Sequence, residues 1–331
     1  MAKDNSEVKV IGGYFELADK DCDLNNYPPE GILLNTCRNA LEYIISQLQD
    51  VKHIYLPLYT CEAVVEPLKR LQVSFDFYHI NTHFEIADDI TLKNNDYIIA
   101  NNYFGLKDAY IAKLSKKYDE HLIVDNAQAF FAPILSGIKA AYSARKYVGV
   151  ADGGFAVGVS DKDIFNYCLD ETKHDSHLLI RKQYGAEAGF KEYQKNELLL
   201  NNQPIRRMSS STYEILSHID FKKIVETRLS NFEYLHKSLA SSNQLEDTLN
   251  ICLTEGFACP MIYPYVGCID DNIRERLIKN KVFVARYWPN VFDWAKPDDF
   301  EYELTNSLIP LPIDQRYGKE DMDRILSILK H

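Results

Sequence analysis

Apolar residues along the first half of the chain alternate between the spacing of helices and the spacing of strands. Residues 39–49 and 111–118 carry apolar side chains at the spacing of an amphipathic helix. Residues 73–78 alternate between apolar and polar positions, and residues 96–101 form a short apolar run, as strands do. Strands that alternate with helices predict an α/β fold with a mostly parallel sheet. The strands expected here are residues 53–58, 73–78, 96–101, 121–124, 139–143 and 155–159, with helices at 39–49, 62–71 and 111–118.

The second half of the chain has a weaker pattern at its start. Residues 170–203 are polar, rich in Lys, Glu and Asn, and predict irregular surface structure. A long helix is expected at about residues 211–238. The tail then predicts a small α/β domain, with strands at 261–265 and 282–286 and helices at 271–280 and 319–329. We therefore expect a large domain over residues 1–210, followed by a connecting helix and small C-terminal domain over residues 211–331.

Composition narrows the class of protein. A net charge of −11 argues against nucleic acid or an anionic membrane surface as the main partner. No run approaches the roughly 18 apolar residues of a membrane span, and the N-terminus lacks the basic-then-apolar order of a secretion signal. The seven cysteines are scattered without a C-x-x-C pair, which predicts reduced thiols in a cytoplasmic protein and no zinc site.

The first candidate for chemistry is Asp125, which directly follows the apolar run 121–124. Ligands collect at the carboxyl ends of the strands in a parallel sheet. A carboxylate buried there requires a cation or hydrogen-bond donors. The same position suits an aspartate that caps the next helix. Asp125 by itself leaves both interpretations open.

The second candidate is Lys146, which lies between two expected strands in a segment of mostly small and apolar residues. A lysine that loses hydration in such a place is competent to form a Schiff base. Most lysines lie on the surface, however, and a Gly-Gly pair such as residues 153–154 marks turns in many folds. Lys146 alone therefore decides nothing.

The order of these elements is more specific than any one of them. Asp125 and Gln128 belong to an Asp-Asn-Ala-Gln motif, Lys146 follows Asp125 by 21 positions, and an Asp-Gly-Gly turn occupies residues 152–154. This order resembles the DegT/DnrJ/EryC1/StrS sugar aminotransferases, which use pyridoxal phosphate (PLP). Further segments are similar to motifs of that family in the same order, namely residues 36–41, 55–60, 102–105, 206–209, 308–312 and 319–324.

The resemblance implies a type I PLP-transferase fold, with a large mostly parallel domain flanked by helices and a small C-terminal α/β domain. It implies that Lys146 carries the cofactor and moves protons at the substrate carbon. Asp125 would pair with the pyridinium nitrogen, and Gln128 would reach the phenolic oxygen. The start of the helix after Thr36 would hold the cofactor phosphate.

The sequence departs from the family pattern around the phosphate. Cys37 and Arg38 stand where the family has Gly-Thr. Arg38 is either a bidentate phosphate ligand or a surface arginine. The family's serine five residues before the lysine is Ala141, with Ser143 as the nearby hydroxyl. The asparagine that a partner subunit donates to the phosphate falls near Ile205.

A second departure concerns the aromatic residue that stacks on the pyridine ring. Its position is occupied by Cys61, so Tyr59 or Tyr103 would have to supply that face. Trp288 and Arg286 fall where the family contacts substrate, and Trp288 is equally suited to packing between the domains. Arg207, like its neighbour Arg206, is either part of an anion site or a solvated charge.

The resemblance implies an aminotransferase that moves an amino group from glutamate to a nucleotide-linked keto sugar, in surface-polysaccharide or related biosynthesis. It also implies a homodimer, because the family's site lies at a dimer interface. A dehydration on the same scaffold is one alternative, but the family's sugar dehydratases have histidine where this chain has Lys146. The other alternative is a non-catalytic relative that binds a sugar nucleotide or a partner protein.

Overall fold

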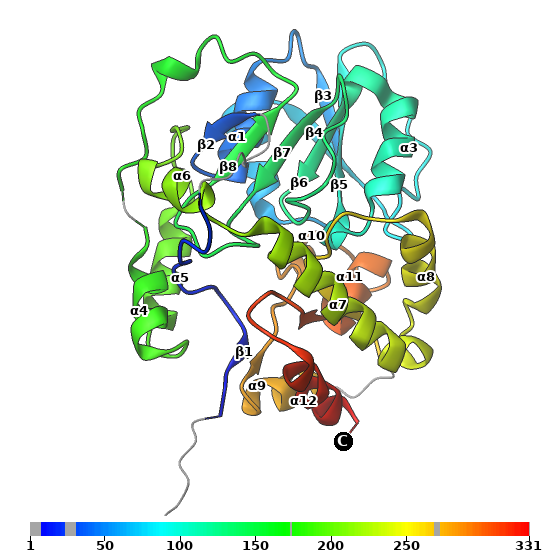
Figure 1. Cartoon of the computed structure of the whole chain (residues 1–331). Helices are drawn as coiled ribbons and strands as arrows, with labels where there is room; N and C mark the ends of the chain where they lie inside the picture. Colours follow the sequence, from blue (N-terminus) through cyan, green and yellow to red (C-terminus); the bar gives the residue numbers. More distant parts are fainter. Residues whose placement is uncertain (1–7, 24–30, 173, 268–271, 331) are drawn as a thin grey trace, which may run out of the picture.

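The computed structural model describes residues 8–23, 31–172, 174–267 and 272–330. A seven-stranded sheet with the order β2-β8-β7-β6-β5-β3-β4 forms its centre (Figure 1). Neighbouring strands are parallel except β8, which is antiparallel to β7 and β2. The expected mostly parallel α/β sheet is therefore confirmed. Its strands are β2 (Ile32–Leu34), β3 (His53–Pro57), β4 (Ser74–Tyr78), β5 (Asp96–Asn101), β6 (Leu122–Asn126), β7 (Lys139–Ser143) and β8 (Gly154–Val157).

Alternate residues of the central strands enter two separate cores, because successive side chains of a strand point to opposite faces. In β6, Ile123 packs with helices α1 (Cys37–Ser46) and α2 (Val65–Arg70). Its neighbours Leu122 and Val124 pack on the other face with α3 (Asp108–Tyr118) and the C-terminal part of the chain. The sheet is thus the middle layer of three.

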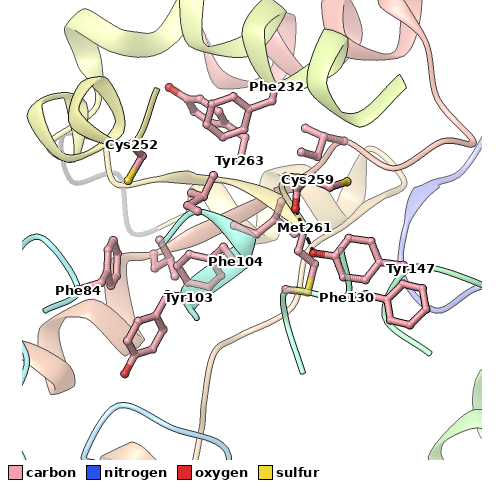
Figure 2. Packing of buried hydrophobic residues seen from close by; sticks show 14 of the residues in the cluster. Phe84, Tyr103, Phe104, Phe130, Tyr147, Phe232, Cys252, Cys259, Met261 and Tyr263 are labelled. Carbon is pink, nitrogen blue, oxygen red and sulfur yellow. Dashed lines mark hydrogen bonds between the residues drawn. The ribbon is translucent and has the colours of Figure 1, made fainter. Parts of the chain in front are cut away.

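The C-terminal part packs directly on this second face. Figure 2 shows Phe232 and Tyr263 beside one another, and Tyr103, Phe104 and Tyr147 in the same core. The elements of this part are α8 (Glu246–Glu255), β9 (Ile262–Tyr265), α9 (Ile273–Lys279), β10 (Val282–Phe283), α10 (Val291–Trp294), α11 (Phe300–Ser307), β11 (Ile309–Pro312) and α12 (Lys319–Leu329). Strand β1 (Ile11–Gly12) pairs with β10, so the start of the described chain lies against its end.

Two expectations for the middle of the chain are wrong. Residues 170–203 contain helices α4 (Ser176–Tyr184) and α5 (Phe190–Leu199) instead of irregular structure. Their buried positions include the polar residues His177, Arg181 and Asn196, so the sequence of these helices shows no continuous apolar stripe.

The expected long helix at 211–238 is two helices, α6 (Ser210–Leu216) and α7 (Phe221–Leu239). Asp220 begins the second one, because its carboxylate accepts the amide N–H of Lys223 at 3.0 Å. Short 3₁₀ helices complete the fold, at Glu62–Val64, Tyr103–Gly105, Asp119–His121, Ile164–Asn166 and Ala240–Ser242. No helix of the described residues is long and apolar enough to cross a membrane.

Candidate functional site

Asp125 lies near the carboxyl end of β6, with Asn101 of β5 and Ala141 of β7 beside it in register. Its side chain is buried, and Oδ1 accepts the amide N–H of Ala127 at 2.8 Å. The Cys37 thiol lies 3.9 Å from the same oxygen. Burial raises the pKa of the Asp125 carboxyl, although the Ala127 amide and the nearby Lys146 act to lower it. The carboxylate therefore has few partners and favours a cationic neighbour.

The N-terminus of α1 faces this carboxylate. Thr36 caps the helix, since its hydroxyl accepts the amide N–H of Asn39 at 3.0 Å. The preceding amides, those of Cys37 and Arg38, have no intrahelical acceptor. Strand β8 approaches this turn so closely that a Cβ on Gly154 would lie 2.2 Å from the carbonyl of Thr36. Glycine at the end of the Asp-Gly-Gly turn therefore allows the strand to pack on the helix start.

The segment that carries Lys146 is held at both ends. The Ala144 amide donates to the carbonyl of Gly153, 2.9 Å away, and the Gly153 amide donates to the carbonyl of Asn35 at 2.7 Å. Asp152 accepts both the amide and the hydroxyl of Ser209, at 2.6 and 2.7 Å. The Asp-Gly-Gly turn thus fastens the lysine segment to the start of α6.

A cavity of about 160 Å³ lies where these parts meet. Of the residues predicted to be catalytic or to bind the cofactor, the structure brings seven to its wall, namely Thr36, Cys37, Arg38, Asp125, Gln128, Ser143 and Lys146. Cys61 and Trp288 line it as well. Burial raises the pKa of the Cys61 thiol and raises that of Cys37 well above its usual value, so both are neutral groups in this wall.

Gln128 carries an unsatisfied donor in this wall. Its Oε1 accepts the Phe104 amide at 3.3 Å, but its Nε2 is buried without an acceptor among the described residues. A buried N–H without a partner is costly, and an acceptor bound in the cavity would satisfy it. The donor set therefore fits PLP, which would offer a pyridinium N–H to Asp125, a phenolic oxygen to Gln128 and a phosphate to the start of α1.

Other predicted residues lie elsewhere. Tyr59 packs against Tyr103 and Trp288 in the core, with ring centroids 5.8 and 4.9 Å away, and lines neither of the two cavities described here. The structure thus brings Trp288, and not Tyr59, to the wall of the cavity of about 160 Å³. Arg38 is at the wall, but Leu200 and Glu66 already hold its Nη1, with both acceptor oxygens within 2.8 Å.

The two remaining arginine candidates are directed away from both cavities. Arg286 donates to the carbonyl of Thr305 at 3.1 Å and lies over Phe292. Arg207 donates to the carbonyl of Tyr167 at 2.9 Å and lies over Phe165. Each of the two guanidinium groups therefore contacts a main-chain carbonyl and an aromatic ring.

A second cavity, of about 770 Å³, shares part of its wall with the first. Lys146, Ser143, Arg145 and Glu197 line both. Arg145 and Glu197 form an ion pair of 2.6 Å. Burial disfavours the negative charge of Glu197, but the Arg145 guanidinium holds the pKa of the Glu197 carboxyl below its usual value.

Neither residue of this pair is among the sites predicted from the sequence. The position of Arg145 next to Lys146 is a usable signal, whereas Glu197 lies in the segment predicted to be irregular. Among the described residues, no group of three His, Cys, Asp or Glu side chains could hold a metal ion.

Comparison with known proteins decides the fold. No protein-family model matches the sequence, and none of the curated proteins matches it. Solved structures match over most of its length. DesV of S. venezuelae, in complex with a ketimine intermediate, has a TM-score of 0.62 at 14% identity, over 94% of this chain and 85% of DesV. A DegT DnrJ EryC1 StrS aminotransferase from Brucella abortus has a TM-score of 0.60 at 12% identity, over 90% and 84%.

The chain has the fold of the DegT/DnrJ/EryC1/StrS aminotransferases. Spr1654 of Streptococcus pneumoniae, solved in apo, PMP and PLP forms, has the same fold. Its PLP form matches with a TM-score of 0.58 at 12% identity, over 96% of this chain and 92% of Spr1654. At such identities the likeness to these aminotransferases establishes the type I fold, which the sequence predicted.

Proposed function

We propose that the protein is a PLP-dependent aminotransferase. The observation that carries this proposal is one cavity lined by Lys146, by the buried carboxylate of Asp125 and by the unpaired amide of Gln128. A lysine amine for the Schiff base and a carboxylate for the pyridinium nitrogen are the groups by which proteins hold PLP, and the amide donor would suit its phenolic oxygen. The same wall includes the start of α1, which suits a phosphate.

Each residue of the cavity wall has a separate proposed role. Lys146 would hold the cofactor through its Nζ, and the same Nζ would take and return a proton at the substrate carbon. Asp125 would keep the ring nitrogen protonated, and a bound PLP in that state would supply an electron sink for the substrate carbon. Gln128 would donate to the phenolic oxygen, while the amides of Cys37 and Arg38 would hold the phosphate. Trp288 lines the same cavity and excludes water there.

The proposed substrate is a nucleotide-linked keto sugar, with glutamate as amino donor, in the biosynthesis of surface polysaccharides or related products. Support comes from DesI, which has the same fold and was solved in the presence of its TDP-sugar product. The cavity of about 770 Å³ beside Lys146 is within the roughly 300–1,000 Å³ range of small-molecule sites. Its shared wall would bring a substrate atom to the lysine.

We also propose a homodimer in the cytoplasm. Large apolar side chains are exposed over a limited stretch of the chain, with Phe165 at 81%, Leu198 at 70% and Tyr184 at 67%. A partner subunit that covers these side chains would remove their apolar surface from water. The described cysteines are free thiols, which suits a reducing compartment.

The absorbance spectrum tests the proposal. Protein purified with PLP should show a visible band that borohydride removes, and Lys146→Ala should lack that band. Lys139→Ala, at the start of β7, is the matched control and should keep it, because Lys139 donates to the Glu120 carbonyl and lines neither cavity. A protein that stays colourless in excess PLP would refute the enzyme assignment and leave the non-catalytic relative.

Amino donors separate the remaining alternatives. If the protein is an aminotransferase, glutamate should convert the visible band to that of the amine form of the cofactor, and a keto acid should restore it. A coloured protein whose spectrum responds to no amino donor would instead favour a dehydration. Sizing chromatography at micromolar concentration tests the dimer, and a monomer would contradict it.

A further inference from the structure

The large cavity beside Lys146 contains two buried arginines that the cofactor chemistry does not use. Arg228 of α7 is 1% exposed and Arg181 of α4 is 7% exposed, yet both line this cavity. Burying a guanidinium is unfavourable unless counter-ions and hydrogen-bond acceptors satisfy all of it, so each requires an explanation.

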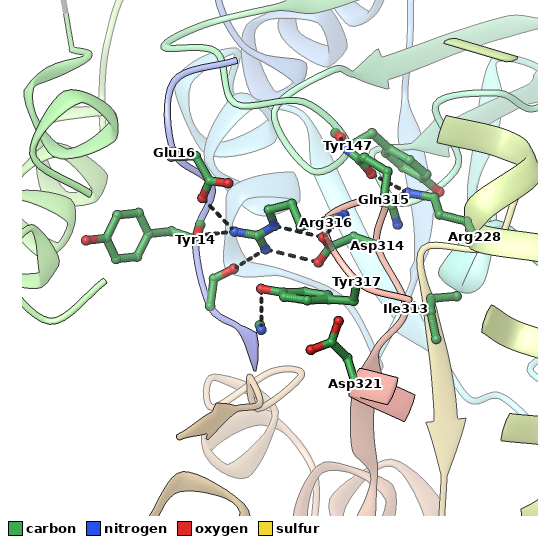
Figure 3. A network of polar contacts seen from close by, with 12 residues as sticks. Tyr14, Glu16, Tyr147, Arg228, Ile313, Asp314, Gln315, Arg316, Tyr317 and Asp321 are labelled. Atoms are coloured by element: carbon green, nitrogen blue, oxygen red, sulfur yellow. Dashed lines mark hydrogen bonds and ion pairs between the residues drawn. The ribbon is translucent and has the colours of Figure 1, made fainter. Parts of the chain in front are cut away.

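Arg228 is held in place by neutral groups (Figure 3). Its Nε donates to Gln315 at 3.1 Å, its Nη1 donates to the carbonyl of Met261 at 2.8 Å, and its guanidinium lies 4.5 Å from the centroid of the Tyr147 ring. Its Nη2 is buried without an acceptor among the described residues. The guanidinium is therefore rigidly placed with one donor group to spare.

The carboxylates around this cavity are already paired. Glu197 pairs with Arg145 at 2.6 Å, and Glu187 pairs with Lys281. Asp314 is close enough to Arg228 for the charge to lower its pKa, but Arg316 occupies both of its oxygens, at 2.7 and 3.0 Å.

Arg228 itself forms no ion pair with any carboxylate of the described residues. One guanidinium at this wall is thus without a directly paired carboxylate among the described residues. Lys146 lines the same cavity, so an anion held by Arg228 would share that space with the lysine.

Arg181 adds a second incompletely satisfied group. Its Nε pairs with Glu16 at 3.0 Å and its Nη2 donates to the carbonyl of Gly12 at 3.1 Å, while Nη1 is buried without an acceptor among the described residues. Glu16 is shared, because Arg316 also pairs with it at 3.1 Å. Burial and the neighbouring Arg316 lower the pKa of Arg181. A bound anion would offset the desolvation cost of the Arg181 charge and weaken its repulsion from Arg316.

We propose that Arg228, together with Arg181, holds an oxyanion of the molecule that exchanges its amino group at Lys146. Arginine presents parallel N–H groups that match carboxylate and phosphate oxygens, so the bound group is one of these two. The inference rests on the proposed function for the identity of the reaction, but the anion site is a property of the apo protein as well. A carboxylate would come from the amino donor, and a phosphate from the nucleotide.

Calorimetric titration distinguishes these sources without any turnover. The probes are glutarate, which carries the carboxylates of a dicarboxylate donor, and thymidine diphosphate. Arg228→Gln should weaken the binding of at least one probe by tenfold or more, as expected for losing hydrogen bonds to a charged group. Arg181→Gln should weaken the same probe. Arg274→Gln is the matched control, because Arg274 donates to the carbonyl of Leu308 at 2.7 Å and lines neither cavity.

Each outcome is decisive. Loss confined to glutarate identifies the donor's carboxylate, loss confined to thymidine diphosphate identifies the nucleotide, and loss of both supports a shared anion site. Binding of both probes unchanged in the two variants would overturn the inference, as would equal weakening in Arg274→Gln. If Arg228→Gln does not fold, the titration of Arg181→Gln decides between these outcomes. A colourless protein whose glutarate binding depends on Arg228 would refute the cofactor proposal alone.

Discussion

Replacing Asp125 by asparagine tests the central electrostatic argument, because it removes the charge and keeps the shape. In the structure this carboxylate has one good hydrogen bond, from the Ala127 amide at 2.8 Å, and a thiol at 3.9 Å. A pyridinium nitrogen would be its main partner. Removing one member of a buried ion pair costs about 3–5 kcal/mol. Since an asparagine amide can still donate to an unprotonated ring nitrogen, we expect about 3 kcal/mol, a loss of about 100-fold in PLP affinity.

The same substitution should have the opposite effect on the cofactor-free protein. Burial raises the pKa of Asp125, so the folded state holds its proton more tightly than the unfolded state does. The stability that this group contributes is present below its unfolded pKa, about 3.9, and is lost as the pH rises through the folded value. Asp125→Asn should therefore be more stable than wild type at neutral pH, by about 1 kcal/mol, and this advantage should shrink at acidic pH.

Absorbance titration with PLP and urea unfolding at pH 5 and pH 7.5 measure both effects. Asp96→Asn is the matched control, because Asp96 is also buried and accepts a main-chain N–H at 3.0 Å, but lies at the opposite end of β5. It should leave PLP affinity unchanged. Equal PLP affinity in wild type and Asp125→Asn, or an equal loss in Asp96→Asn, would refute the role given to this carboxylate.

Two further predictions concern the frame of the site. Gly154→Ala should lower the free energy of unfolding by about 3 kcal/mol, because the new Cβ would lie 2.2 Å from the Thr36 carbonyl. Gly318→Ala meets no atom within 4 Å and should cost much less in the same urea titration; similar losses would contradict the packing argument. Burial, followed by the charge of Arg145, lowers the pKa of His177 to about 4. Wild type should therefore lose stability as the pH falls from about 6.5 to 4, and His177→Gln should lose less; parallel pH profiles would show that His177 titrates normally.

Local pattern determined much of this protein. The apolar run 121–124 located β6 and the alternation at 73–78 located β4, because a buried strand and a half-buried strand each leave such a pattern in the sequence itself. Asp125, Gln128 and Lys146 were found by their order along the chain, and the structure brings them to one cavity.

Only the tertiary structure decided which residues complete the wall. Helix α5 buries little apolar surface, so nothing local indicated it or its Glu197, which reaches the cavity of Lys146 only through folding. Arg228 is enclosed by Met261, which directly precedes β9, and by Gln315 in the loop before α12, and these partners are 33 and 87 residues away in sequence. Periodicity reports the face that a residue presents, whereas its charge partners depend on which distant segments pack there.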